Sequence, residues 1–194
     1  VVSLCELCDC VYLFHSRRGY KVQVRREGRR PRQMYIRDRI NPVVQNFGAV
    51  YAIPEATIRP DSTNQYKIVV DLKSGGEKPS DYSFGLHNVA RMLNLHEVGG
   101  GFNDQMTVVL AIHGDATFAV LDNAAYKRKF GINNPNIDLI RELKVAGVQL
   151  TVCGQSLIAR KIKPITVLPE VEISISMLTT MATCQMKGFA VFQF

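Results

Sequence analysis

The sequence predicts a three-layer α/β/α sandwich built on a five-stranded, mainly parallel sheet. From residue 66 to residue 194, short runs rich in β-branched residues alternate with segments of helical period. Strands joined by helices need right-handed crossovers, which make the strands parallel and place helices on both faces of the sheet. The run 171–176 (VEISIS) instead alternates strictly between apolar and polar residues. A strand buried on both faces does not alternate, so this strand is expected at a sheet edge.

The first strand and the first helix are predicted near the start of this domain. Residues 66–73 (YKIVVDLK) are typical of a buried strand, and the segment 75–79, with two glycines and a proline, interrupts the pattern after it. A helix is expected to begin near Ser80 and to end at the glycine run 99–101. Its inward face is predicted to consist of residues spaced at i, i+4, i+7 and i+11: Tyr82, Leu86, Val89 and Leu93.

A second strand and a second helix are predicted next. Residues 107–113 (TVVLAIH) form an apolar run that favours a strand. A helix is expected after it and should end near Gly131. Its apolar stripe is predicted to consist of Phe118, Leu121 and Ala125.

A third helix and a third strand complete the middle of the domain. The helix is expected at about residues 136–146, with Asn136 as a candidate cap and Gly147 as its stop. Its inward residues are predicted to be Leu139, Ile140, Leu143 and Ala146. Residues 148–153 (VQLTVC) then form the strand, and residues 155–161 a short helix.

Two further elements follow the edge strand 171–176. A last helix is predicted from the apolar spacing of Leu178 and Met181, which Gln185 continues on the same face. Residues 189–194 form the fifth strand.

The composition is that of an ordinary globular protein. The chain has 194 residues, of which 46% are hydrophobic and 21% charged, and this excludes a wholly disordered chain, a collagen-like repeat and a disulfide-dense miniprotein. No run reaches the roughly 18 apolar residues of a membrane-spanning helix, so a soluble protein is expected. Five cysteines are an odd number and do not make a disulfide framework. No secretory leader can be read, which favours a cytoplasmic location; a periplasmic location is the alternative for a chain that has lost its leader.

The positive charge divides the chain into three zones. Residues 1–40 hold ten Lys and Arg against four Asp and Glu, a net charge of +6 out of the +7 of the chain. This segment shows no hydrophobic period and is expected to be a poorly ordered or non-core arm. Residues 41–65 contain three prolines and are expected to form an extended strap, and residues 66–194 form the α/β domain.

The arm has two alternative functional interpretations. Four soft ligands (Cys5, Cys8, Cys10 and His15) within eleven residues suggest a zinc site, although structural zinc sites usually use two separated pairs of ligands. The arginines from residue 17 to residue 32 suggest contacts to nucleic-acid phosphates, but no aromatic residues or binding fold accompany them. A solvated arm is the preferred interpretation, and no metal or cofactor is expected in the α/β domain.

Two residues lie where reactive groups gather in open parallel sheets, at the carboxyl ends of strands. His113 ends the second predicted strand, and Cys153 ends the third, just before a helix that begins with Gly154, Gln155 and Ser156. Backbone N–H groups and the helix dipole at such a position favour the thiolate. Gly154 is expected to allow a sharp turn that leaves the sulfur accessible. The alternative is that Cys153 is a small buried core residue.

Other motifs give weaker signals. No second cysteine lies beside Cys153, which disfavours a redox switch, and Cys184 lies among apolar helix residues as expected for packing. His87 and Asn88 are expected to be solvated or capped, with a role at a subunit interface or near the site as the alternative. The loop with Gly75 and Gly76 lacks the full glycine-rich phosphate pattern, and no Ser-His-acid signature is present.

Residues 66–194 resemble the DsrE/DsrF-like proteins, whose better-known members carry sulfur in intracellular sulfur oxidation and in tRNA thiolation relays. The resemblance depends on the order and spacing of several segments: YKIVVDL, LHNVARMLN, VVLAIHGDA, NPNIDLIRELKVAGVQLTVCGQSL and MKGFAVFQF. The strap segment NPVVQNFGAVYAIPEA looks like an extension found in some members.

The resemblance implies a fold and an activity. It implies the strand order 4-3-2-1-5 and places Cys153 at the reactive cysteine of the family, which accepts sulfane sulfur as a persulfide and passes it on. His113 would lie towards Cys153 as an orienting partner or proton donor; the alternative is a strand-end histidine satisfied by local hydrogen bonds. Gly154, Gln155 and Ser156 would support the thiolate. The expected protein is a sulfur carrier or sulfurtransferase that forms a trimer or hexamer, with donor and acceptor proteins or small persulfides as partners. The alternative is a non-catalytic oligomeric binding module whose cysteine is structural.

Overall fold

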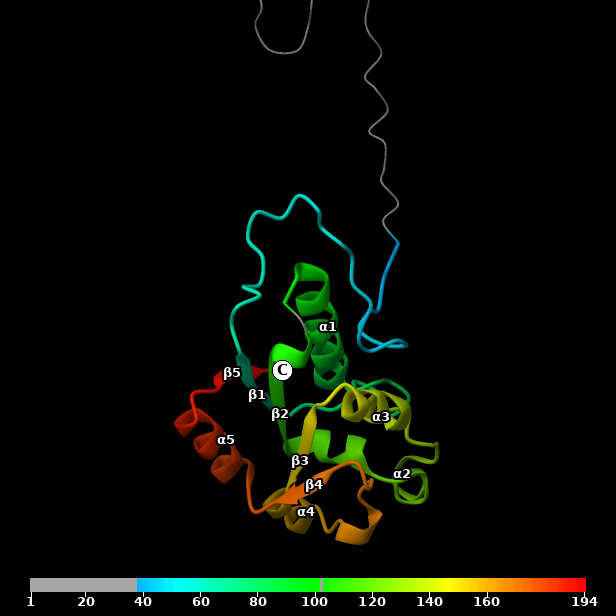
Figure 1. Ribbon diagram of the computed structural model, residues 1–194. Helices are drawn as coiled ribbons and strands as arrows, with labels where there is room; N and C mark the ends of the chain where they lie inside the picture. The colour runs from blue at the N-terminus through cyan, green and yellow to red at the C-terminus, as the bar shows by residue number, and fades with distance from the viewer. Residues whose placement is uncertain (1–37, 102) are drawn as a thin grey trace, which may run out of the picture. The chain divides into compact units, whose positions relative to one another are not determined.

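Five parallel strands in the order β4-β3-β2-β1-β5 form the centre of the fold (Figure 1). The computed structural model describes residues 38–101 and 103–194. The strands are β1 (Tyr66–Leu72), β2 (Met106–Ile112), β3 (Gln149–Cys153), β4 (Glu172–Ser174) and β5 (Ala190–Gln193). The predicted strand order is confirmed, and β4, the segment predicted from its alternation, lies at an edge of the sheet.

Helices cover both faces of this sheet. They are α1 (Phe84–Gly99), α2 (Asn123–Phe130), α3 (Ile137–Val145), α4 (Gly154–Ala159) and α5 (Met177–Met186), with short 3-10 helices η1 (Asn103–Gln105), η2 (Gly114–Val120) and η3 (Pro164–Thr166). In Figure 1, α1 and α3 lie on one side of the strands and α5 on the other. The predicted three-layer architecture is therefore confirmed.

Successive apolar residues along the strands point alternately to the two faces of the sheet, where they form two interfaces with the helices. The larger core contains Leu72, Leu110 and Leu150 from the strands, packed with Leu86 of α1 and Leu139 of α3. The smaller core on the other face joins Val69 of β1 and Val109 of β2 to α5. Burying a leucine or valine side chain contributes about 1.5–3 kcal/mol, so the α1–α3 face supplies most of the stabilisation.

The first helix begins later than predicted. It starts at Phe84 rather than near Ser80, and Tyr82 precedes the helix with half of its surface exposed. Asp81 ends a tight turn, because its N–H donates to Lys78 O (3.0 Å) and its carboxylate accepts from Lys78 N (3.2 Å). A side chain that satisfies the backbone of a turn competes with helix formation, and this local competition explains the difference.

The predicted helical stripe of Phe118, Leu121 and Ala125 is wrong. Leu121 is extended (φ −79°, ψ 149°) and separates η2 from α2. It forms an antiparallel bridge with Val167, which ties this connection to the segment after α4. Asp122 then caps α2 by accepting a hydrogen bond from Ala125 N (2.6 Å). Gly131 ends this helix as predicted, with φ +80°.

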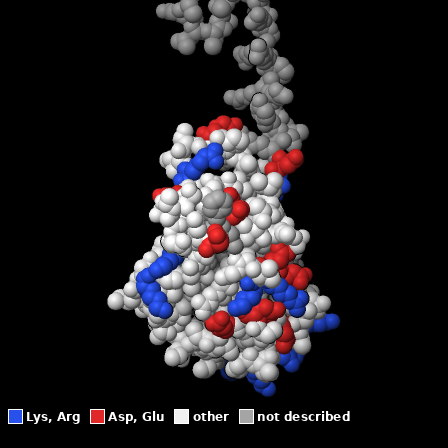
Figure 2. All heavy atoms as spheres, in the orientation of Figure 1, with Lys and Arg blue, Asp and Glu red and all other residues white. Residues whose placement is uncertain are grey.

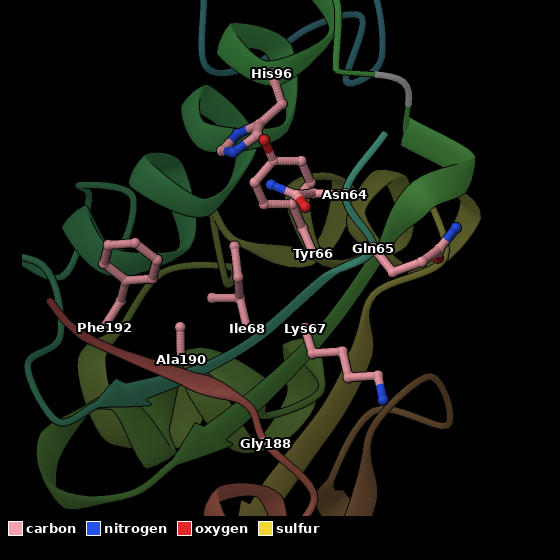
Figure 3. Close-up of a pocket in the computed structure, with 9 residues that line it drawn as sticks. All are labelled: Asn64, Gln65, Tyr66, Lys67, Ile68, His96, Gly188, Ala190 and Phe192. Carbon is pink, nitrogen blue, oxygen red and sulfur yellow. The ribbon is translucent and has the colours of Figure 1, made fainter. Parts of the chain in front are cut away.

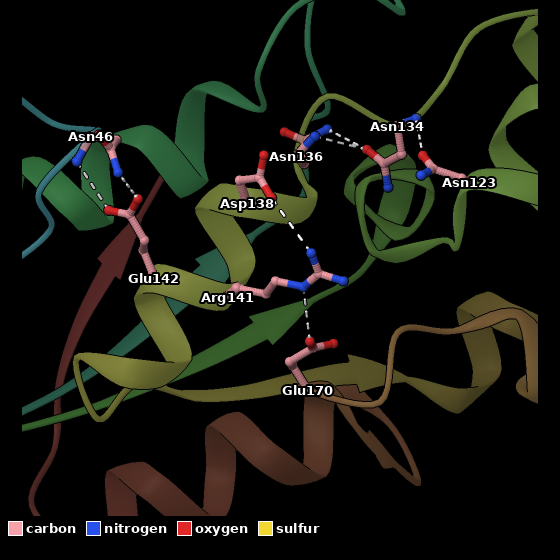
Figure 4. Close-up of polar contacts among 8 residues, drawn as sticks. All are labelled: Asn46, Asn123, Asn134, Asn136, Asp138, Arg141, Glu142 and Glu170. Atoms are coloured by element: carbon pink, nitrogen blue, oxygen red, sulfur yellow. Dashed lines mark hydrogen bonds and ion pairs between the residues drawn. The ribbon is translucent and has the colours of Figure 1, made fainter.

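Buried asparagines fix the chain between α2 and α3 (Figure 4). Asn134 Nδ2 donates to Ala119 O (2.8 Å) and Leu121 O (2.6 Å), and Asn134 N donates to Asn123 Oδ1 (2.9 Å). Asn136 occupies the predicted cap position of α3, but its side chain makes no cap hydrogen bond. Its Oδ1 instead accepts from Ser83 N (2.7 Å), so it joins the start of α3 to the start of α1.

Asn94 of α1 holds the segment 43–48 of the predicted strap against the helix. Its Oδ1 accepts from Val43 N (2.9 Å) and Val44 N (3.0 Å), and its Nδ2 donates to Phe47 O and Gly48 O (both 3.0 Å). Gly48 has φ +67°, and a Cβ there would lie 2.4 Å from Arg91 N. The strap therefore contacts the helix backbone directly, and Asn94 satisfies four backbone polar groups of the strap.

Most of the predicted arm, residues 1–37, lies outside the described residues. The candidate zinc ligands Cys5, Cys8, Cys10 and His15 and the arginines from residue 17 to residue 32 belong to this part. Among the described helices, none combines the length and the apolar composition that a bilayer-spanning segment requires.

Replacing Asn94 by Ala is expected to lower the free energy of unfolding by about 2 kcal/mol or more, because buried backbone groups of the strap lose their partner. Urea denaturation measures this change, and hydrogen exchange at residues 43–48 should accelerate. Asn88→Ala on the same helix is the control, since the structure records no side-chain hydrogen bond for Asn88 among the described residues. Equal losses in the two variants would contradict a stabilising role of the strap.

Candidate functional site

Cys153 lies at the carboxyl end of β3, where the chain turns into α4. It is the last residue of the strand and occupies the N-cap position of the helix (φ −69°, ψ 115°). In the sheet it pairs with Ser174 of β4. Side chains two or four positions apart in a strand point to the same face of the sheet, so Cys153 shares a face with Gln149. Gln149 pairs with Val109 of the smaller core, so this face is the one covered by α5.

Hydrogen-bond donors from two helix starts surround the sulfur. Its Sγ lies 3.9 Å from Ser176 Oγ, the N-cap residue of α5. Burial raises the pKa of the Cys153 thiol, but the N–H of Met177, the hydroxyl and N–H of Ser156 and the hydroxyl of Ser176 together outweigh burial and hold that pKa below its ordinary value. The positive ends of two helix dipoles act in the same direction. The site therefore stabilises the thiolate more than ordinary solvent surroundings would.

The same groups cover the sulfur. Cys153 exposes only 3% of its surface, which is less than the accessible sulfur expected from the sequence. Ser156, from the predicted trio of supporting residues, does provide donors to the sulfur. Ser176 and Met177 come from the first turn of α5 and were not predicted. A reagent in solution therefore has little direct access to this sulfur.

Gly154 allows the close packing of α4 on β4. A Cβ at this position would lie 2.8 Å from Ser174 O, shorter than any real contact of that kind. The glycine therefore brings the start of α4 against the edge strand, next to Cys153. Its role is this close approach, since its φ is not positive.

His113 is hydrogen-bonded to Asp71 at the same end of the sheet, where the strands reach their carboxyl ends. His113 Nε2 and Asp71 Oδ1 are 2.6 Å apart, and both side chains are largely buried. Because an ionised carboxylate only accepts, Nε2 carries the proton. His113 follows Ile112, which pairs with Val152, so its backbone is adjacent to that of Cys153. Its ring turns towards β1, and its recorded partner is Asp71 rather than Cys153.

Asp71 is the functional candidate that sequence reasoning missed. It stands between Val70 and Leu72 in a buried strand and one position before the end of that strand. A carboxylate inside such a run is a signal, since burying an unpaired charge is costly. Ser176 gives a second signal, because a serine before an apolar helical segment is a typical N-cap.

Two other residues singled out in the sequence have structural partners. Cys184 is buried with Val69 and Val109, which confirms its role in packing; burial raises its pKa, against the lowering effect of Lys187. His87 Nε2 accepts a hydrogen bond from Gly48 N (3.3 Å), and burial together with Arg91 lowers its pKa. His87 therefore holds the strap.

The described residues also enclose two shallow pockets away from Cys153. One, of about 330 Å³, lies at the opposite edge of the sheet, near the first residues of β1 and β5 (Figure 3). Tyr66 and His96 pack edge to face in it, with ring centroids 5.0 Å apart. The other, of about 280 Å³, lies beside the loop after β1.

Charges do not separate by sign on the face shown in Figure 2, and the described residues hold no cluster of potential metal ligands. On the face shown in Figure 2, Lys and Arg side chains lie among Asp and Glu side chains instead of forming a basic patch. Within residues 38–101 and 103–194, no group of three or more His, Cys, Asp or Glu side chains could hold a metal ion.

Comparisons with known proteins relate the α/β domain to one family. The model of the DsrE/DsrF-like family matches residues 67–194. A protein of unknown function from Methanobacterium thermoautotrophicum, MTH1491, is 15% identical with a TM-score of 0.49, and the ychN protein from E. coli is 21% identical with a TM-score of 0.46. Each match covers 66% of this chain and 99% of the other. The comparison with curated proteins finds no match.

Cys153 is expected to ionise at a lower pH than Cys184, because donors lower the first pKa and burial raises the second. Pulsed alkylation with iodoacetamide across a pH series measures the ionisation midpoint of each cysteine. The two can be followed separately, because trypsin releases them in different peptides, residues 145–160 and 162–187. Ser156→Ala should move the midpoint of Cys153 to higher pH and leave that of Cys184 unchanged. A Cys153 midpoint at or above that of Cys184 would disprove the stabilised thiolate.

Proposed function

Since the family model matches residues 67–194, the chain belongs to the DsrE/DsrF-like family, and we propose that it carries sulfane sulfur as a persulfide on Cys153. The observation that supports this proposal is the set of donors from Ser156, Ser176 and Met177, which lowers the pKa of the thiol. Thiolates are the nucleophiles in sulfur exchange, and a thiol with a lowered pKa supplies more thiolate near neutral pH. This chemistry needs no metal or cofactor.

Loading begins with attack of the Cys153 thiolate on the outer sulfur of a donor persulfide, R–S–SH. A new S–S bond forms to Cys153 while the S–S bond of the donor breaks. The electron pair of the broken bond leaves with the donor as R–S⁻, which then takes up a proton. Cys153 becomes Cys153–S–SH, and the two partners together undergo no net oxidation or reduction.

Unloading repeats the same exchange in the opposite sense. An acceptor thiolate attacks the outer sulfur of Cys153–S–SH, and the Cys153 thiolate is the leaving group. The donors that stabilise the resting thiolate also stabilise this leaving group, so they favour release. Donors and acceptors are proteins or small molecules that present a persulfide or a thiolate.

His113 is proposed to orient the incoming partner beside Cys153. Asp71 holds the imidazole by its Nε2 atom, which leaves the unprotonated Nδ1 to accept a hydrogen bond from that partner. His113 follows β2 directly beside the end of β3, so a donor bound over Cys153 lies next to it. Asp71 is a positioning residue in this scheme.

Incubation with a small-molecule persulfide donor is expected to add one sulfur atom to the tryptic peptide 145–160, which contains Cys153 and no other cysteine. Mass spectrometry without reductant detects the addition. Peptide 162–187, with Cys184, is the internal control and should stay unmodified under the same conditions. The proposal fails if peptide 145–160 gains no sulfur, or gains it no faster than peptide 162–187.

The binding-module alternative is favoured by the burial of Cys153 and by an exposed apolar surface close to it. Ile158 of α4 exposes 73% of its surface, Ile175 79% and Leu178 of α5 72%. These residues come from elements that adjoin β3 and the edge strand β4. Exposed apolar residues of this kind mark interaction sites. We propose that they form the contact of a homo-oligomer, a trimer or hexamer as family resemblance implies, whether or not Cys153 transfers sulfur.

Replacing Ile175 and Leu178 together by Lys is expected to lower the oligomer mass to that of the monomer, because charges would be buried in the contact. Light scattering after size-exclusion chromatography measures the mass. Ile58→Lys is the matched control, since Ile58 lies on the strap and is 92% exposed. A wild-type chain that elutes as a monomer, or a double variant that assembles normally, would contradict this contact.

A further inference from the structure

A second concave site lies at the carboxyl ends of β1 and β2, where open parallel sheets usually bind ligands. This pocket, of about 280 Å³, is lined by the loop after β1, by η2 and by α2. Its lining includes Gly75, Gly76, Lys78, Phe118, Lys129 and Phe130 but neither Cys153 nor His113. The pocket therefore has no part in the proposed sulfur chemistry.

Hydrogen bonds and close backbone packing hold the walls of this pocket in place. Tyr126 of α2 is buried and donates its hydroxyl hydrogen to Pro79 O (2.8 Å). Asn136 Oδ1 accepts from Ser83 N (2.7 Å) at the other end of the loop. A Cβ on Gly76 would lie 2.8 Å from Asp81 O, so the loop closes tightly on itself. These contacts preform the site and reduce the entropy lost when a ligand binds.

The loop presents donors that have no acceptor. The backbone N–H groups of Gly75, Gly76 and Glu77 donate to no acceptor within the described part of the chain. Backbone N–H groups that have no acceptor in the protein can donate to a bound anion. Asp115, also in the lining, is already paired with Arg160 (3.2 Å).

Two lysines add positive charge to this pocket. Neither Lys78 nor Lys129 pairs with a carboxylate among the described residues, and both line the pocket. Lys129 Nζ lies 4.2 Å from the centroid of the Phe118 ring and 5.4 Å from that of Phe130. The rings hold the ammonium group at the pocket without neutralising it. The exposed carboxylate of Glu77 is also in the lining, and Asp81, which accepts from Lys78 N (3.2 Å), lies close to Tyr126; the two lysines offset these two charges.

Three aromatic side chains form the apolar wall. Phe118 and Phe130 meet edge to face with centroids 5.7 Å apart, and Tyr126 lies 4.6 Å from Phe130. Such a wall offers flat, rigid contact area to a planar group. The volume lies just below the usual range for drug-sized ligands, about 300–1,000 Å³, so it suits one ring rather than a dinucleotide.

We propose that this pocket binds a small organic anion that carries a single planar ring. The anionic group would accept hydrogen bonds from the N–H groups of residues 75–77 and from Lys129, and the ring would pack on the aromatic wall. This inference does not depend on sulfur transfer, because no residue is shared between the two sites.

Phenyl phosphate is the probe, and titration calorimetry with the full chain measures its affinity. Inorganic phosphate has the anion without the ring, and benzyl alcohol has the ring without the anion; both are expected to bind at least about tenfold more weakly, since each loses one set of contacts. In ¹⁵N-resolved NMR spectra, phenyl phosphate should shift the amide signals of Gly75, Gly76 and Glu77.

Lys129→Gln is expected to weaken binding of phenyl phosphate by about tenfold or more, as for other hydrogen bonds to a charged group. Lys127→Gln is the matched control, because Lys127 lies on the same helix and outside the pocket. Phe130→Leu should weaken phenyl phosphate and leave inorganic phosphate unchanged. The proposal is overturned if the two lysine variants bind alike, if inorganic phosphate binds as tightly as phenyl phosphate, or if the loop amides do not shift.

Discussion

The parallel register of β1, β2 and β3 is the constraint on which the candidate site depends. Ala111 of β2 pairs with Asp71 on one side and with Thr151 on the other. Two residues further on, the same register brings His113 and Cys153 to one edge and to one face of the sheet. The pairing of β4 with β3 adds the last element, since the chain leaves β4 beside Cys153 and begins α5 above it.

Local pattern was sufficient to predict the strands, the crossover helices and the two residues at the strand ends. The pattern of apolar residues along an element shows which of its faces pack against the core. The apolar runs of β1, β2 and β3 therefore predicted these three strands. The surroundings of Cys153 were not evident, because Ser176 and Met177 reach it only through the pairing of β3 with β4. The direction of the His113 ring likewise depends on Asp71, which lies 42 positions away in the chain.

Polar side chains account for the elements that were predicted wrongly. Asp81 and Asp122 satisfy backbone groups in turns or caps, so apolar spacing alone extended the neighbouring helices too far. Asn94 and Asn134 are buried because backbone groups of other segments satisfy their amides, as buried polar groups require. Asn94 bonds to residues about fifty positions earlier, a separation at which no sequence spacing signals the contact.

The first turn of α5 contributes both to the burial of Cys153 and to its lowered pKa, and these two effects oppose each other in the proposed sulfur transfer. The first turn of α5 supplies two of the donors that favour the thiolate, and the same turn closes the sulfur off from solvent. A turn that opened fully would admit a donor but remove the groups that stabilise the nucleophile. The proposed exchange would be most favourable if the incoming partner displaced this turn while Ser156, on the α4 side, kept its contacts with the sulfur. A partner that bound the exposed apolar residues around Ile175 and Leu178 would act directly on this turn, so the proposed contact and the proposed reactivity of Cys153 would be coupled.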